Sequence, residues 1–520
     1  MLAELLQALP PLDIPFVPGR ASATSKYYNH PLPVPTGVMA FVPHPWSRLP
    51  PETLDEIISF VPPTSRPALA LVSRRLCTLT LRQIYANLVL RSPVAVVQCC
   101  RTLVHGNPLA GRAVRTFEIS YPSRPFRLLH AFYTLIAQAL EHIPNVRCLS
   151  LLVPDPSFAT VLTLTGTLTL PRLVHFNSRL SISDPGVVPF LRRHRQISYL
   201  QLNEHSACPW TRSSAPPSIA PDIDITLPKL EYFSGNSAAL APVIQGGAAL
   251  RAAFITWDSD AWPPVDVLLP VSVSGELSGS DPDAALVALG RNCTDTLNFL
   301  ECRRQGWNLD LLDRIATHLP HIYALSLTNV FSSTEGEPDG GAGPSFAQPL
   351  ANISAIASSL RRFSCLERLI ITCINAWYPW EECACDMDAA FDAVTAWGAA
   401  CASLVECTPP QSPRIRWIRV VDNFWLPDLA SLPMPSSLKA QCVRWLAACL
   451  RNSSYPWKRI VETMPVLKAF RAKLELLDCP ARVDSAIENS EEFLALRRVR
   501  FSGVGWDVDV DEDFLPDSGE

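Results

Sequence analysis

The chain has 520 residues, of which 48% are hydrophobic and 18% charged, and its formal net charge is −5. The hydrophobic share excludes a wholly disordered chain. The length predicts two or three domains or one elongated repeat array, because a domain holds roughly 100 to 200 residues. The slight negative charge gives no global basic field, so nucleic acid is not expected as a partner.

The sequence also argues against a membrane or secreted protein. No stretch reaches the roughly 18 uninterrupted apolar residues of a membrane-spanning helix. The first residues carry Glu4 without a nearby Lys or Arg, unlike a secretory signal. We therefore expect an intracellular protein, in the cytoplasm or the nucleus, without a membrane partner. In that setting the 16 cysteines are interpreted as buried thiols and not as disulfide partners.

The chain begins with two segments that differ in amino-acid composition. Residues 1–46 are rich in proline and predict a largely disordered arm, since proline fixes φ and removes a backbone donor. Residues 47–92 predict a unit of three short helices. Pro51 and Glu52 suit the first turn of the first helix, and the apolar residues that follow have the i, i+3, i+4, i+7 spacing of a helix, namely Leu54, Ile57, Ile58 and Val61.

Two more helices are expected after a break at Pro62 and Pro63. Their apolar stripes lie on either side of a predicted turn near residues 78–80 and consist of Leu69, Val72 and Leu76, then Leu81, Ile84, Tyr85 and Leu88. Three such helices are too small for a secure core. The unit is therefore expected to need a partner or a neighbouring domain.

Residues 47–90 resemble the F-box family. The resemblance rests on a Leu-Pro opening, an acidic first turn, a Leu-x-x-Ile helix and a Val-Ser-Arg-Arg segment before a tyrosine-containing helix. The matching residues are Leu49, Pro50, Glu52, Leu54, Ile57, Ile58, Leu69, Val72, Ser73, Arg74, Arg75, Leu76 and Tyr85. The sequence departs from the family at Leu76, where an aromatic residue is common, and in its proline-rich turn. Any three-helix unit would bury apolar residues at these spacings, so it is the ordered combination of motifs that favours the F-box.

The resemblance implies that these helices bind Skp1, the adaptor of cullin-RING ubiquitin ligases. The residues expected to contact Skp1 form an apolar surface that a domain this small cannot bury alone, and they are Leu49, Pro50, Leu54, Ile57, Ile58, Val72 and Leu76.

A short pattern repeats between residues 113 and 505, with apolar residues mostly at positions 1, 4 and 6. Ten copies begin 20 to 49 residues apart, at Val114, Val146, Leu173, Ile197, Leu230, Leu250, Leu297, Ile322, Leu366 and Ile415. This spacing brackets the leucine-rich-repeat period of roughly 20 to 29 residues and adds insertions. The region is similar to leucine-rich repeats and predicts an irregular α/β solenoid of strands and helices, in which each unit buries one face against its neighbours.

Details of the repeat support this prediction only in part. A helix is expected from Leu309, capped by Asn308 and ended by Pro320. The Asn found at position 9 of regular leucine-rich repeats is present only as Asn423, while Asn329 lies one position early. An ordinary α/β domain therefore remains the alternative.

The last third of the chain contains further segments. Residues 332–349 predict a flexible insertion, because they combine Gly, Pro, Ser and acidic residues without periodicity. Helices near 437–450 and 455–477 predict a cap for the array, followed by a strand near 495–501. Residues 506–520 carry seven acidic residues and no Lys or Arg, and predict a solvated tail, with docking onto a basic partner as the alternative.

Few residues point to chemistry. The most suggestive cluster is Glu381, Glu382, Cys383, Cys385, Asp386 and Asp388, but Cys-x-Cys is not the usual zinc spacing and no second ligand pair follows. Phosphate-binding loops, nucleophile elbows and zinc helices of the known motif types are missing. Cys99 and Cys100 are expected in the core, and His142 and His318 near helix ends. We predict no catalytic residue, metal or cofactor.

A local concentration of tryptophan, at Trp377, Trp380 and Trp397, is a candidate partner-binding region, with burial between repeats as the alternative. Taken together, the patterns predict the substrate-recognition subunit of an SCF-type (Skp1-cullin-F-box) E3 ubiquitin ligase, which positions an unknown target protein and leaves bond formation to other subunits. Two other hypotheses stay open: a Skp1-binding or degenerate F-box scaffold that joins no ligase, and a hydrolase or transferase within residues 113–500.

Overall fold

The computed structural model describes residues 49–121, 128–153, 155–202, 225–257, 282–305, 309–331, 353–375, 386–410, 415–421, 423–428, 436–451, 457–463, 465, 467–468 and 471–472. Two compact units divide the chain, residues 1–251 and 252–520, and each is considered by itself. Sequence reasoning does not predict this division. The arm at 1–46, the insertion at 332–349, the strand near 495–501 and the tail at 506–520 lie outside the described residues.

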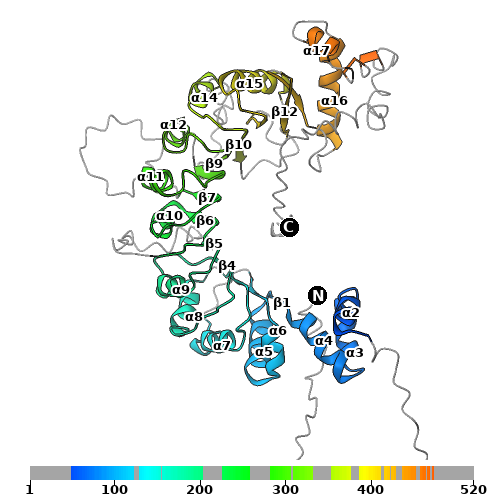
Figure 1. The fold of residues 1–520 in the computed structure, drawn as a ribbon, viewed down its shortest axis with the longest axis vertical. Helices are drawn as coiled ribbons and strands as arrows, with labels where there is room; N and C mark the ends of the chain where they lie inside the picture. The colour runs from blue at the N-terminus through cyan, green and yellow to red at the C-terminus, as the bar shows by residue number, and fades with distance from the viewer. Residues whose placement is uncertain are drawn as a thin grey trace, which may run out of the picture. The chain divides into compact units, whose positions relative to one another are not determined.

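The first unit begins with a small group of helices (Figure 1). They are α2 (Pro51–Ser59), the 3-10 turn η2 (Pro63–Ser65), α3 (Arg66–Ala70) and α4 (Arg74–Tyr85). Helix α4 begins where Ser73 Oγ accepts a hydrogen bond from the backbone N–H of Leu76 at 3.2 Å, as an N-cap residue should. The predicted turn near residues 78–80 is therefore wrong: α4 runs through it, and the turn lies between α3 and α4.

Strands and helices alternate through the rest of the first unit. The described strands are β1 (Asn87–Leu90), β2 (Thr116–Ile119), β3 (Cys148–Leu151), β4 (His175–Ser178), β5 (Tyr199–Leu202) and β6 (Tyr232–Asn236), and neighbours in chain order pair in parallel. Residues at the same position of neighbouring copies are paired across these strands. At the third position, for example, Thr116 pairs with Cys148 and Cys148 pairs with His175.

Helices connect these strands and lie along one side of them in Figure 1. They are α5 (Pro93–His105), α6 (Pro108–Ala113), α7 (His130–Glu141), η3 (Pro156–Phe158), α8 (Ala159–Leu164), α9 (Val187–Arg193) and α10 (Ser237–Ile244). Side-chain caps fix several helix starts: Ser92, Asn107 and Asn236 each accept a backbone N–H of the turn that follows.

The core of the first unit lies between strands and helices. Positions 4 and 6 of each copy in this unit are buried, as Phe117 and Ile119 are, because alternate strand residues face the helices. Phe176 of β4, for example, packs on Phe190 of α9 with ring centroids 4.8 Å apart. The strand at β1 follows the same pattern from Tyr85, a copy that the sequence analysis missed.

The second unit continues the alternation. Parallel strands β7 (Ala252–Thr256), β8 (Phe299–Gln305), β9 (Ala324–Phe331), β10 (Arg368–Asn375) and β11 (Glu406–Thr408) are connected through α11 (Pro282–Asn292), α12 (Leu309–His318), α14 (Ile353–Leu360) and α15 (Met387–Ala400). Helix α12 confirms the helix predicted from Leu309, while its predicted cap Asn308 is not described.

The second unit ends in antiparallel pairing. Strands β12 (Trp417–Val421) and β13 (Phe424–Pro427) form a hairpin that pairs with β11. The copy predicted at Ile415 is therefore not a parallel repeat unit, and the parallel strand at this point is β11, which follows Leu404. Helix α16 (Ser436–Arg451) confirms the helix predicted near 437–450, and α17 (Trp457–Thr463) covers part of the next. Within the described residues, no helix has both the length and the apolar content to cross a membrane.

Candidate functional site

The helices α2 to α4 build a small core of their own. Leu54 and Ile58 of α2 are 2% and 0% exposed and pack against Leu79 of α4. Leu49, Leu69 and Leu76 lie at the edge of this cluster and are partly buried. Leu54 and Ile58, which the sequence analysis assigned to a docking surface, are therefore core residues, because a helix can turn its i and i+4 positions to only one neighbour at a time.

Polar contacts hold these helices in place. Arg66 at the start of α3 donates from Nε to the Val61 carbonyl at 3.0 Å and from Nη2 to the Ser59 carbonyl at 3.1 Å. Gln83 of α4 donates to the Asp55 carboxylate of α2 at 3.1 Å. Arg75, part of the Val-Ser-Arg-Arg segment, donates to the Leu49 carbonyl, so it fixes the residues that lead into α2.

Helix α4 also joins this group to the rest of the first unit. It packs against α6 and β1. Burial raises the pKa of the Tyr85 hydroxyl at the end of α4, and the nearby Cys99 of α5 raises it further. The expectation that three helices need a neighbour is thus met, at least on the α4 side, by the chain itself.

A different set of apolar side chains remains exposed. Phe60, Leu71 and Val72 are 81%, 75% and 69% exposed, Ile57 is 39% exposed, and Pro50 is also exposed. Phe60 follows α2 with a helical backbone, so it shares one side of the helix with Ile57 at i and i+3. Leu71 and Val72 form the connection from α3 to α4. Phe60 and Leu71 were missed by the sequence analysis, although Phe60 is visible as an apolar residue off the Leu54 and Ile58 stripe.

Comparison with protein families identifies this group of helices. The family model described as the F-box domain matches residues 46–85. Residues 46–85 are an F-box domain. The match covers less than a tenth of the chain, and no curated protein matches the sequence. The F-box domain therefore leaves the apolar side chains of Ile57, Phe60, Leu71 and Val72 exposed, outside a core of Leu54, Ile58 and Leu79.

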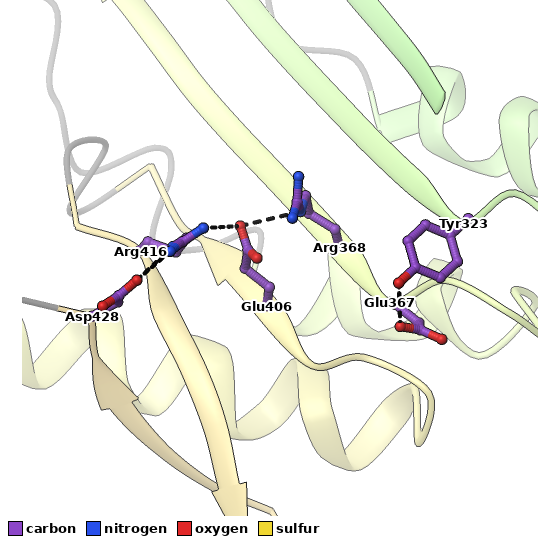
Figure 2. Close-up of polar contacts among 6 residues, drawn as sticks. All are labelled: Tyr323, Glu367, Arg368, Glu406, Arg416 and Asp428. Atoms are coloured by element: carbon purple, nitrogen blue, oxygen red, sulfur yellow. Dashed lines mark hydrogen bonds and ion pairs between the residues drawn. The ribbon is translucent and has the colours of Figure 1, made fainter. Parts of the chain in front are cut away.

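The second unit contains a network of charged side chains, which is shown in Figure 2. Glu406 of β11 accepts from Arg368 of β10 at 3.2 Å and from Arg416 at 3.4 Å, and Arg416 also pairs with Asp428. Burial would lower the pKa of Arg416, but Glu406 and Asp428 outweigh it and raise that pKa. The network compensates its own charges and ties the β12–β13 hairpin to the parallel strands.

Beside this network, Tyr323 donates to Glu367 at 2.6 Å. Burial, then the hydrogen bond to Glu367, raises the pKa of Tyr323 to about 12. A hydroxyl with that pKa stays protonated at neutral pH and is poorly suited to act as a general base there. The hydrogen bond connects the residues that directly precede β9 and β10.

Four of the described thiols, Cys99, Cys100, Cys302 and Cys407, are buried in environments that make them unreactive. Burial raises the pKa of Cys99 to about 12 and that of Cys100 further, and the fully buried Cys302 and Cys407 are raised well above their ordinary value. A nucleophilic cysteine needs the opposite shift. The prediction that Cys99 and Cys100 belong to the core is confirmed.

The remaining candidate residues have structural positions. Asp386 caps α15 by accepting from the Ala389 N–H at 2.9 Å, and Asp388 accepts from Trp445 Nε1 at 2.8 Å. Trp397 is fully buried. His142 and His318 lie at the ends of α7 and α12, as predicted. Trp377, Trp380, Glu381, Glu382, Cys383 and Cys385 lie outside the described residues, and the described residues contain no cluster able to hold a metal ion.

Proposed function

We propose that this chain is the substrate-recognition subunit of an SCF-type E3 ubiquitin ligase. Its F-box domain holds a Skp1-like adaptor, the adaptor connects it to a cullin, and the α/β region selects a target protein. The observation that carries the proposal is an F-box domain at residues 46–85 that leaves Ile57, Phe60, Leu71 and Val72 in contact with water.

The energetics favour a partner on this surface. Fully burying a large apolar side chain stabilises a complex by roughly 1.5 to 3 kcal/mol. Three of the four side chains are more than two thirds exposed, so most of that free energy is available only on binding. Leu49, Pro50 and Leu76 lie at the margin of the same domain, where contact with an adaptor is compatible with their partial exposure.

We further propose that the α/β region is a leucine-rich-repeat-like solenoid. Each of the strands β2 to β10 begins two residues after the first position of a predicted copy, and the parallel registers are constant within each unit. Such stacks have extended surfaces suited to binding another protein. The chain would position its target and have no catalytic site of its own, working in the cytoplasm or the nucleus.

A pull-down separates this proposal from its alternatives. Tagged wild-type chain should recover both a Skp1-like adaptor and a cullin, and Phe60→Asp with Leu71→Asp should recover neither. Leu129→Asp is the control, since Leu129 is 78% exposed at the start of α7 and lies outside residues 46–85 of the F-box domain. Recovery of adaptor but never cullin would favour the scaffold, and equal recovery by all three proteins would refute the assigned surface. An activity that persists in the double variant without adaptor would favour a hydrolase or transferase.

A further inference from the structure

The net charge of the chain conceals a strongly basic stretch. Residues 66–195 contain 16 arginines, no lysine and four acidic residues. Lysine and arginine are equally good at solubilising a surface, but the planar guanidinium pairs with carboxylates and phosphates through two parallel hydrogen bonds. With 16 arginines against four acidic residues, the stretch has a net charge of +12 carried by groups suited to pairing with anions.

Four of these arginines lie together at one edge of the first unit. Arg82 lies in the last turn of α4, Arg115 and Arg147 directly precede β2 and β3, and Arg172 lies three residues before β4. The backbone N–H of Arg147 donates to the carbonyl of Arg115 at 2.7 Å, and Val174 N–H donates to the carbonyl of Arg147 at 2.8 Å. Because parallel strands begin at the same edge of a sheet, these side chains form a row, named here the arginine ridge.

The charges of the ridge are not compensated from within. Burial lowers the pKa of Arg115, and Arg172, Arg147 and Arg82 lower it further, so these three charges are close enough to repel that of Arg115. Among the described residues, no carboxylate forms an ion pair with any of them.

Other arginines of the stretch have structural roles, which the ridge largely lacks. Arg193 donates to the carbonyls of Thr165 and Leu168, and Arg91 lies near Glu118. Among contacts within the described residues, Arg115 is the only member of the ridge that donates in this way, to the carbonyls of Arg112 and Val114. Arg147 and Arg172 are exposed and have no hydrogen-bond acceptor among the described residues.

We propose that the arginine ridge binds an acidic peptide segment, rich in Asp and Glu, of the protein that this chain selects. The proposal rests on the proposed function and names the chemistry of the segment recognised. Neighbouring strands are about 4.8 Å apart, so the three arginines before β2, β3 and β4 span roughly 10 Å. An extended peptide rises about 3.3 Å per residue, so three or four of its residues match this row.

A short peptide fits this surface better than nucleic acid does. The whole chain is negative, with a net charge of −5, so it repels a long polyanion, whereas a short segment senses charges within about 8 Å, the screening length at physiological salt. The aromatic side chains at the starts of β4, β5 and β6, namely His175, Tyr199 and Tyr232, are stacked on one another with ring centroids 5.2 and 4.1 Å apart, so the faces between them are not open to the bases of a single strand.

Fluorescence anisotropy with the purified full-length chain tests the ridge directly. The probe is a labelled, end-blocked hexapeptide of alternating Glu and Asp, and the comparison peptide has Gln and Asn instead. We expect Arg147→Ala with Arg172→Ala to weaken binding of the acidic peptide about tenfold. The control, Arg101→Ala with Arg361→Ala, removes the same charge from two exposed arginines elsewhere and should change binding less than twofold.

The double variant is expected to fold, because it removes two exposed side chains that repel Arg115. Arg147→Lys with Arg172→Lys keeps the charge and should lose affinity by an intermediate factor. Equal losses in the ridge and control variants would overturn the proposal, and so would tighter binding of a six-phosphate oligonucleotide through the same arginines. The assay contains no adaptor, so its failure is distinct from failure of adaptor binding in the pull-down.

Discussion

Replacing Ile58 of α2 and replacing Phe60, which directly follows that helix, should have opposite consequences. Phe60 is 81% exposed and Ile58 is 0% exposed. Truncating Phe60 to Ala should leave folding within about 0.5 kcal/mol of wild type, as surface substitutions usually do. If an adaptor covers most of the ring, the same change removes about 1 to 2 kcal/mol of binding, or roughly 5- to 30-fold in Kd.

Ile58→Ala should instead destabilise the F-box domain by about 2 to 5 kcal/mol, because it leaves a cavity against Leu54 and Leu79. Hydrogen exchange of the α2 and α4 amides measures this local stability, and calorimetric titration of a Skp1-like adaptor measures Kd. The reasoning is refuted if Phe60→Ala binds the adaptor as tightly as wild type, or if Ile58→Ala leaves exchange in α2 unchanged. Leu54→Asp would be the obvious variant if Leu54 contacted the adaptor. Because Leu54 is buried, this change is expected to unfold the domain, so it cannot test adaptor binding.

Three further predictions follow from packing and titration. Gly398→Ala in α15 should lower the thermal midpoint and the free energy of unfolding, the latter by about 1 to 3 kcal/mol, because the new Cβ would collide with Asn423 Oδ1 and Trp425 Nε1. Gly247→Ala should lower the free energy of unfolding by less, because its Cβ meets no atom, although its φ is +81°. Raising the pH above 10 should destabilise the chain, because the pKa values of Tyr133 and Tyr323 are raised to about 12 in the folded state, so these tyrosines ionise first in the unfolded chain. Their contribution to stability is complete below pH 10 and is lost as the pH rises towards 12. The loss should be smaller in Tyr323→Phe. Iodoacetamide at pH 8 should modify the exposed Cys365 and spare Cys99 and Cys100, and mass spectrometry showing the reverse would contradict their burial.

The strand pattern shows what the sequence can predict. Nine of the ten copies mark the strands β2 to β10, because a buried parallel strand repeats the same apolar positions wherever it occurs. The strands β1 and β11 were missed, since one copy begins with Tyr85 and the other has Cys407 at position 4. The strand at the copy that begins at Ile415 is antiparallel to its neighbours. The direction of a strand depends on the connections between strands, here the short one between β12 and β13, and the spacing of apolar residues does not reveal it.

The F-box domain could be located from its sequence, but which of its apolar residues are buried could not be predicted. Motif order located it, and the match to residues 46–85 confirms that location. Helical spacing placed Leu54, Ile57 and Ile58 on one apolar stripe, but only packing against Leu79 decides which of them are covered. The arginine ridge was overlooked for a related reason: a net charge averages over the chain, while recognition depends on charges that the fold brings together.

Asn423, which the sequence singled out, makes hydrogen bonds that connect two elements of the structure. Predicted as the position 9 asparagine, it donates to the Thr395 carbonyl of α15 at 2.8 Å and accepts from Trp425 Nε1 at 3.1 Å. It thus connects the terminal hairpin to the preceding helix, much as an asparagine that satisfies backbone groups at a turn would. The polar network around Arg416, by contrast, has no sequence signature, because only the pairing of strands β10 to β13 brings Arg368, Glu406, Arg416 and Asp428 together.

The most direct measurement of the central claim is hydroxyl-radical footprinting of the full-length chain with and without a purified Skp1-like adaptor. The account predicts that the adaptor protects Phe60 and Leu71 from oxidation while Leu129, equally exposed in the free chain, keeps its rate. Unchanged oxidation of Phe60 and Leu71 in a complex that has formed would place the adaptor elsewhere and contradict the assigned surface.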